Sequence, residues 1–192
     1  MLIKSLLSLF TLSFLALNLL IFNAYSKAEI TQHYTELEWD ALIPKEDLDI
    51  LLNPPESILN ISDGSSLDTL DNLKSITDEA TRRYYQALHS TRVVSTLKQQ
   101  KVKLPGFIVP LVSDQQNKVT EFFIVPYFGA CLHMPPPPPN QIVFVKIQNG
   151  IEIDSLFDAY WFEGTLDIST NNHELGNSAY ILSLDKHYEY LL

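Results

Sequence analysis

The stretch that constrains the fold most runs from Val119 to Ile147, where two apolar segments flank five consecutive prolines. Residues 119–125 and 142–147 are rich in β-branched and aromatic side chains, which is typical of short strands. Neither segment alternates cleanly between apolar and polar residues, so we expect both strands to bury much of each face. Because proline cannot donate a hydrogen bond to a sheet, the segment between them is predicted to leave the sheet as a stiff, extended loop.

The second half of the chain carries further strand patterns. They lie at residues 101–112, 160–168 and 178–184. Pro105-Gly106 and Pro110 interrupt the first pattern, and Gly164 interrupts the second. Proline and glycine inside a strand usually mark a bulge, a bend or an edge. We therefore expect strongly bent strands, which favour closure of the sheet.

Turn sequences connect these strand patterns. Residues 114–117 are polar and predict a hairpin turn. Asn149-Gly150 is the strongest hairpin signal in the chain, so we expect a return strand to begin at residues 151–153. Five or six short strands with hairpin links predict a mainly β domain over residues 95–192, built as a small antiparallel barrel.

The first residues have the three parts of a secretory signal peptide. Lys4 precedes an uncharged apolar run at residues 5–22, and small residues follow at positions 24, 26 and 28. This order predicts a signal peptide over residues 1–28, with the mature chain beginning at Lys27 or Glu29. The apolar run is also long enough for an uncleaved anchor. With cleavage, we expect a periplasmic protein that keeps no stable membrane span.

Residues 29–94 are expected to form an N-terminal docking segment and a helix. An acidic and aromatic sequence around Trp39 leads into apolar residues, which predicts a segment that docks on the barrel. Residues 45–52 are expected to form a short helix, ended by the prolines that follow. A longer helix with one apolar face is predicted to start at Thr77, whose hydroxyl would cap it.

The chain is strongly acidic, with 23 Asp and Glu residues against 13 Lys and Arg residues and a formal net charge of -10. The acidic residues all follow the predicted signal peptide, so the mature chain is more acidic than the whole chain. An acidic balance without a basic cluster argues against nucleic acid and against anionic lipid surfaces as partners. Solubility is a sufficient explanation of the charge.

The single cysteine, Cys131, lies in the proline-rich loop and is followed two residues later by His133. An exported protein meets an oxidising compartment, so a cysteine without an intrachain partner is buried, metal-bound, reactive or paired with another chain. On an extended segment both side chains point the same way, and a thiolate with an imidazole suits zinc or copper. Two ligands are too few for a zinc site, so further donors must come from elsewhere. The available donors are Glu38, Asp40, Glu121, His173 and His187.

The residues alone leave three interpretations of this pair open. The first is the metal site. In the second, His133 activates Cys131 as the nucleophile of a thiol enzyme. In the third, Cys131 packs as a small apolar residue and His133 bonds to a backbone carbonyl, while the loop serves as a connector or a docking element.

The residues around the pair are expected to support the loop. This supporting set comprises Glu121, Tyr127, Gly129, Pro135, Pro136, Pro137, Asn140 and Gln141. The amides of Asn140 and Gln141 are expected to satisfy loop carbonyls, since prolines have no N–H to offer them. Four aromatic residues would give the region a rim: Phe107, Tyr127, Phe128 and Trp161. Such side chains belong to a core more often than to a ligand platform.

Four segments of the chain resemble one bacterial family. They are EWDALIP, KLPGFIVPLV, VTEFFIVPYFGACLHMPPPPPNQIVFV and WFEGTL. The resemblance is to an uncharacterised family of exported proteins, domain of unknown function 3299, and it covers residues 38 to about 184. It implies an oligonucleotide/oligosaccharide-binding-like (OB-like) barrel. It also implies periplasmic metal handling, because members are often encoded beside ABC-transporter components linked to metal uptake. It implies no reaction, and the barrel type does not imply nucleic acid.

Together these observations predict a periplasmic accessory protein that binds zinc or a similar ion at Cys131 and His133 and supports an envelope transporter. The first alternative is an interaction module whose proline loop docks on a partner. The second alternative is a thiol-dependent enzyme. A metal site needs a third and a fourth donor close to the pair, whereas a docking module needs an exposed proline loop beside an apolar patch.

Overall fold

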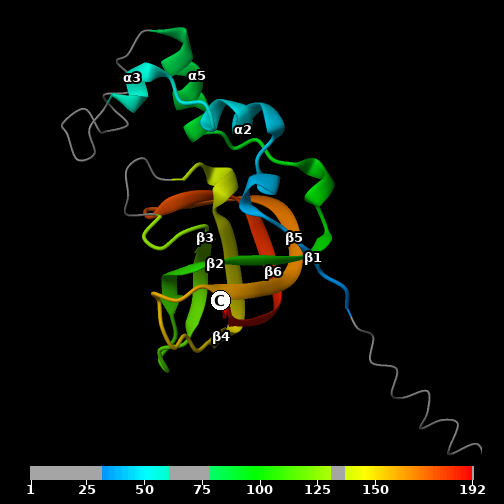
Figure 1. The fold of residues 1–192 in the computed structure, drawn as a ribbon. Helices are drawn as coiled ribbons and strands as arrows, with labels where there is room; N and C mark the ends of the chain where they lie inside the picture. The colour runs from blue at the N-terminus through cyan, green and yellow to red at the C-terminus, as the bar shows by residue number, and fades with distance from the viewer. Residues whose placement is uncertain (1–31, 61–77, 131–136, 192) are drawn as a thin grey trace, which may run out of the picture. The chain divides into compact units, whose positions relative to one another are not determined.

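The β-branched and aromatic runs of the second half of the chain form five strands that close into a barrel (Figure 1). They are β2 (Gln100–Ser113), β3 (Val119–Val125), β4 (Val143–Ile151), β5 (Tyr160–His173) and β6 (Gly176–Glu189). The computed structural model describes residues 32–60, 78–130 and 137–191. Residues Tyr34–Leu192 form one compact unit. The mainly β class expected from the sequence is confirmed.

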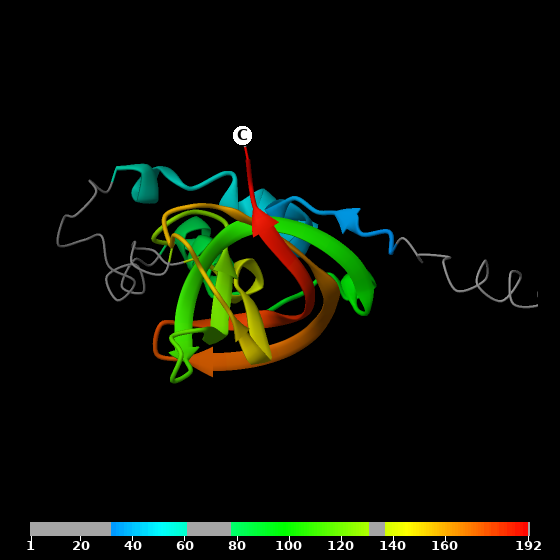
Figure 2. The same cartoon turned by 90° about the horizontal axis from the view of Figure 1, so that it is seen from below.

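The barrel closes because β2 pairs with a different strand in each half. Its first half pairs with β5 up to Gly106↔Tyr160, and its second half pairs with β3 from Phe107↔Val125 onward. Gly106 lies at the change of partner, where an added Cβ would be 2.6 Å from Ile124 Cγ2. A glycine is therefore needed for this close approach. Figure 2 shows the resulting ring of strands from below.

The order of strands around the barrel is β2-β3-β4-β6-β5, and β5 returns to β2. β4 and β6 are parallel, through Val143↔Tyr180 and Phe144↔Ile181, whereas the other pairings within the ring are antiparallel. The barrel is thus mixed, because the chain reaches β6 through β5 and not through a hairpin from β4. This five-stranded barrel agrees with the OB-like fold expected from the resemblance.

The prediction of a hairpin turn at Asn149-Gly150 is wrong. Both residues lie inside β4, and Gly150 has a φ of 59°. The register moves from Val119↔Ile151 to Glu121↔Lys146, so Thr120 alone lies opposite residues 147–150. An Asn-Gly pair readily adopts the left-handed conformation, which a β-bulge can require as well as a hairpin turn. Here the left-handed Gly150 is part of a bulge within β4. After Ile151 the chain forms a loop, and the next strand pairs with β2 and β6.

Short elements precede and interrupt the barrel. They are β1 (Thr35–Glu36), η1 (Trp39–Leu42), α2 (Lys45–Leu51), α3 (Glu56–Leu59), α5 (Glu79–Leu88), η2 (Ser95–Leu97) and η3 (Pro139–Gln141). The N-cap of α5 is Asp78, whose carboxylate accepts the Thr81 N–H at 2.8 Å, and not Thr77 as the sequence pattern suggested. In the part of the chain that the structure describes, no helix combines the length and apolarity that crossing a membrane requires.

The N-terminal segment docks on the barrel through buried and partly buried hydrogen bonds as well as apolar contacts. Trp39 Nε1 donates to the Pro105 carbonyl at 2.7 Å, and Leu42 is fully buried in the barrel core. The Tyr180 hydroxyl donates to the Leu42 carbonyl at 2.9 Å and accepts the Val94 N–H at 2.7 Å. One core side chain therefore holds two stretches of the N-terminal segment.

The barrel interior is filled by alternate residues of each strand. Its buried members include Val102, Leu104, Ile108, Phe122, Ile124, Val143, Val145, Phe162, Leu166, Tyr180 and Leu182. On β3 the intervening residues are buried too, so the expectation that this strand buries both faces is confirmed. We call the set inside the ring the inner core.

A second cluster covers the outside of the barrel wall. Its buried members are Phe123, Val125, Ala130, Ile142 and Phe144, with Phe107, Val109, Leu111 and Ile181 packed against them. The tip of the β5–β6 hairpin reaches this cluster, where the ring centroid of His173 lies 6.0 Å from that of Phe123. We call this set the outer cluster.

Candidate functional site

The Cys131–His133 pair lies outside the residues that the structure describes, together with Pro135 and Pro136. The structure therefore defines the two ends that hold this loop, but not the geometry of the pair itself. The metal, thiol and structural interpretations of the pair remain predictions. Zinc titration of the wild type, with Cys131→Ser and His133→Ala as controls, tests the metal prediction directly.

The chain enters the loop through a tight turn anchored in the outer cluster. After β3 ends, the Ala130 N–H donates to the Tyr127 carbonyl at 3.2 Å, and Gly129 has a φ of 75°. Only glycine adopts this left-handed conformation without steric cost, which explains its place here. The Ala130 side chain is buried in the outer cluster. The residue before Cys131 is thus firmly attached to the barrel wall.

The chain leaves the loop through η3, which is also firmly attached. Asn140 Nδ2 donates to the Arg92 carbonyl at 2.9 Å, and Gln141 Nε2 donates to the Trp39 carbonyl at 2.5 Å. The sequence suggested that these amides satisfy backbone carbonyls, but their partners belong to the N-terminal segment and not to the loop. Pro138 is buried and Pro137 is partly buried, so the described end of the proline run packs on the protein.

Most of the additional metal donors considered from the sequence have other surroundings. Glu121 pairs with Lys146 at 2.7 Å, and His173 Nδ1 accepts the Leu175 N–H at 3.2 Å. The ring of His187 lies 6.4 Å from that of Tyr160. Within residues 32–60, 78–130 and 137–191, no three His, Cys, Asp or Glu side chains gather closely enough to hold a metal ion. The described residues thus provide no ready-made metal centre.

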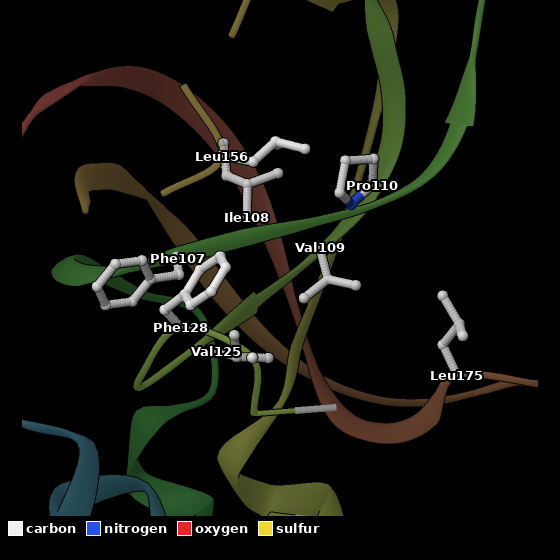
Figure 3. Close-up of a pocket in the computed structure, with 9 residues that line it drawn as sticks. Phe107, Ile108, Val109, Pro110, Val125, Phe128, Leu156 and Leu175 are labelled. Carbon is white, nitrogen blue, oxygen red and sulfur yellow. The ribbon is translucent and has the colours of Figure 1, made fainter. Parts of the chain in front are cut away.

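The structure instead places an apolar pocket of about 160 Å³ beside the entrance to the loop. It is lined by Phe107, Ile108, Val109, Pro110, Val125, Phe128, Gly129, Leu156 and Leu175 (Figure 3). These residues come from β2, the end of β3, the turn before Cys131, the loop between β4 and β5, and the β5–β6 hairpin. The pocket therefore forms where three loops meet on the barrel wall.

Exposed aromatic and aliphatic side chains surround the pocket. Phe128 is 49% exposed, Phe157 is 74% exposed and Leu175 is 43% exposed. The ring of Phe128 lies 5.0 Å from that of Phe157 and 6.3 Å from that of Phe107. We call the five residues Phe107, Phe128, Leu156, Phe157 and Leu175 the apolar patch.

Sequence reasoning found only part of this patch. Phe107 and Phe128 were considered as a rim, but Phe128 was expected to belong to a core. Trp161 lies elsewhere: its ring is 4.9 Å from that of Tyr190, and Lys103 Nζ is 3.7 Å from its centroid. Leu156 and Phe157 were missed. The signal that could have found them was their position: Leu156 and Phe157 are two adjacent large apolar residues in an otherwise polar connecting segment. A surface loop has no structural requirement for such residues, so they can indicate a binding surface.

The fold and the loop define a class of OB-like barrel proteins with a proline-rich loop on the barrel wall. The family described as "Protein of unknown function (DUF3299)" matches residues 39–189, and the chain belongs to this family. A crystal structure of a DUF3299 family protein from Pseudomonas aeruginosa is similar, with 34% sequence identity and a TM-score of 0.59. That match covers 84% of this chain and 99% of the other chain. No curated protein matches the chain.

Proposed function

We propose that this protein is an exported interaction module of the cell envelope, which binds a partner protein through the apolar patch beside its proline loop. The observation that carries the proposal is the exposed aromatic pair Phe128 and Phe157, of which Phe128 lines an apolar pocket. Envelope transporter components are the partners we propose. In this role the barrel is a rigid support and catalyses no reaction.

The physical argument starts from the cost of exposing these side chains to water. Full burial of an exposed large apolar side chain contributes about 1.5–3 kcal/mol, and each patch residue can contribute the part of this that corresponds to the area it still exposes. Contiguous exposed apolar residues on a soluble protein commonly mark a binding surface. Aromatic side chains beside a pocket are typical anchors of protein interfaces. The pocket of about 160 Å³ suits one inserted side chain of the partner.

The attachment of the surrounding loops supports the same proposal. Ala130 is buried in the outer cluster at one end of the proline loop, and Asn140 holds the other end to the Arg92 carbonyl. Leu175 extends from a hairpin whose strands pair up to His173↔Gly176. A binding surface held in place before the partner arrives loses little conformational entropy on binding.

The test begins with a photo-crosslinking residue introduced at position 157 of the full chain in the envelope. A residue at position 52, where Leu52 is 69% exposed on the N-terminal segment, serves as the control. The crosslinked partner is identified by mass spectrometry, and its affinity for the purified protein is then measured by calorimetry. We expect crosslinks from position 157 and not from position 52.

Two double variants then test whether the patch supplies the affinity. Phe128→Ser with Phe157→Ser removes the aromatic pair, and Leu52→Ser with Leu59→Ser removes two leucines that are 69% and 66% exposed. We expect the first pair to weaken partner binding at least about tenfold, which is about 1.4 kcal/mol, and the second to leave it unchanged. Equal affinity of the partner for both variants and the wild type would exclude the apolar patch as the binding surface.

A further inference from the structure

We infer that the partner segment bound by the apolar patch is cationic, with an apolar anchor flanked by Lys or Arg residues. This inference rests on the proposed function and adds the chemistry of the partner. The inference is carried by the charges next to the patch residues in the sequence. Asp154 and Asp158 in the loop between β4 and β5, and Glu174 in the β5–β6 hairpin, are all acidic.

Three exposed carboxylates flank the patch residues along the chain. Asp154 and Asp158 lie on either side of Leu156 and Phe157, and Glu174 precedes Leu175. In the part of the chain that the structure describes, none of these three carboxylates forms an ion pair. Glu152, in contrast, is paired with Lys118 at 2.9 Å, so its charge is compensated locally.

The segments that line the pocket contain no basic residue close to the lining positions in the sequence. No Lys or Arg lies within two positions along the chain of any residue that lines the pocket. The chain as a whole carries a formal net charge of -10, which adds to the negative potential at this surface. An approaching segment therefore meets an apolar pocket whose loops carry exposed carboxylates that form no ion pair among the described residues.

This charge pattern selects among the possible occupants. A second copy of this chain would bring an equally acidic patch against the first, so like charges disfavour self-association. An anionic lipid or a fatty acid would bring its charged head group to the same acidic rim. A protein segment with Lys or Arg beside its apolar anchor satisfies both the pocket and the rim.

The two parts of the surface have different tasks. An exposed ion pair contributes little to affinity and is screened by salt, so most of the affinity comes from apolar burial. The carboxylates act mainly on the choice of partner and on the rate of association. The inference therefore predicts that the preference for cationic over anionic segments decreases as the salt concentration rises. The contribution of apolar burial to the affinity should remain.

Three synthetic peptides test the preference with the purified mature protein. Each carries the same Phe-Leu anchor, flanked on both sides by Lys, by Ser or by Glu, and fluorescence anisotropy gives its Kd. At low salt we expect the Lys peptide to bind at least about tenfold more tightly than the Glu peptide. At high salt we expect the two affinities to converge, because mobile ions screen the exposed carboxylates.

A triple variant identifies the charges responsible. Asp154→Asn, Asp158→Asn and Glu174→Gln should remove the preference for Lys and leave the affinity for the Ser peptide unchanged. The matched control changes three exposed acids of the N-terminal segment, as Glu38→Gln, Asp49→Asn and Glu56→Gln, and shifts the net charge equally. We expect the control to retain the preference, since the effect depends on charge near the patch.

The outcomes separate this inference from the proposed function. If Phe128→Ser with Phe157→Ser abolishes binding of all three peptides but they bind the wild type equally, the patch binds segments and the cationic inference is wrong. If the double variant binds every peptide as the wild type does, the patch is not the binding surface and both proposals fail. Concentration-dependent dimerisation through the patch, or tighter binding of a fatty acid than of the Lys peptide, would also overturn the inference.

Discussion

The inner core and the outer cluster lie on opposite sides of the same barrel wall and have different relations to solvent. On β3, Phe122 points into the ring and Phe123 points outward, and both are fully buried. The inner core is enclosed by the strands together with the N-terminal segment, which contributes the fully buried Leu42. The outer cluster, in contrast, borders on the apolar patch. Phe107 packs against the outer cluster and also contacts the exposed Phe128 of the patch.

This difference separates stability from binding. The closed ring and the N-terminal segment bury the interior completely, so inner residues contribute to the free energy of folding. The outer cluster is shielded from solvent by the turn at Ala130 and by the β5–β6 hairpin. This shielding is incomplete at the apolar patch, where side chains remain exposed. The apolar residues that remain exposed there are not needed to hold the barrel together, so they are available for the proposed binding of a partner.

The largest effect is expected from Phe122→Ala. Removing a fully buried Phe from a closed core costs its transfer free energy and leaves a cavity, about 3–5 kcal/mol in total. Phe123→Ala should cost less, because the β5–β6 hairpin can move towards the space it leaves. Denaturant unfolding of both variants measures the difference. A larger loss for Phe123→Ala would show that the outer cluster supports the barrel more than the inner core does.

A smaller effect is expected from Tyr180→Phe. This change keeps the ring in the inner core but removes the hydroxyl that bonds to the Leu42 carbonyl and the Val94 N–H. Leaving these groups unpaired should cost about 1–3 kcal/mol. The loss is measured by denaturant unfolding. Tyr188→Phe is the comparison: its hydroxyl donates to the Glu163 carboxylate at 2.8 Å at a less buried position of β6, so its removal should cost less. An unchanged free energy of unfolding would mean that Tyr180 does not hold the N-terminal segment.

Alkaline pH should act on the same residue. Burial raises the pKa of Tyr180 above its usual value of 10.0, while the hydrogen bond from the Val94 N–H opposes this shift. The folded state then holds the proton more tightly than the unfolded state. Its contribution to stability is complete below pH 10 and decreases as the pH rises through the folded-state pKa. Unfolding midpoints measured across this range should fall more steeply for the wild type than for Tyr180→Phe, and parallel curves would contradict the prediction.

The smallest effect on stability is expected from Phe157→Ser. Because this side chain is 74% exposed, its removal should change the free energy of unfolding by no more than about 0.5 kcal/mol. The same change should weaken partner binding, so one variant separates the two properties. Thermal unfolding checks the first part. A loss of stability similar to that of Phe123→Ala would place Phe157 within the outer cluster and remove the basis for the division.

Much of the barrel follows from local patterns. The apolar composition of residues 119–125 predicted a strand buried on both faces, and the turn at residues 114–117 was expected between two strands. The structure agrees on both points, with the Asp114 carboxylate accepting the Gln116 and Lys118 N–H groups at 2.9 Å. Asn149-Gly150 was misinterpreted because its left-handed preference suits a bulge as well as a hairpin.

The candidate site was less accessible to sequence reasoning. The pattern drew attention to Cys131 and His133, which the structure does not describe, so the site predicted there stays a prediction. It could not identify Leu156, Phe157 or Leu175 as neighbours of Phe128. These residues are separated by about 30–50 positions along the chain. Their proximity depends on which strands pair, and a loop residue carries no periodic signal of its position in space.

By itself, the sequence determined the mainly β class, the family, the two-sided burial of β3 and the acidic character of the chain. These properties depend on composition and on side-chain periods that act over a few residues. Only the tertiary structure decided that β2 changes partner at Gly106, that β4 and β6 run parallel, and that three loops bring exposed apolar side chains together. The reason is physical: strand pairing is a long-range choice governed by closure of the whole barrel, and surface neighbours are a consequence of that closure.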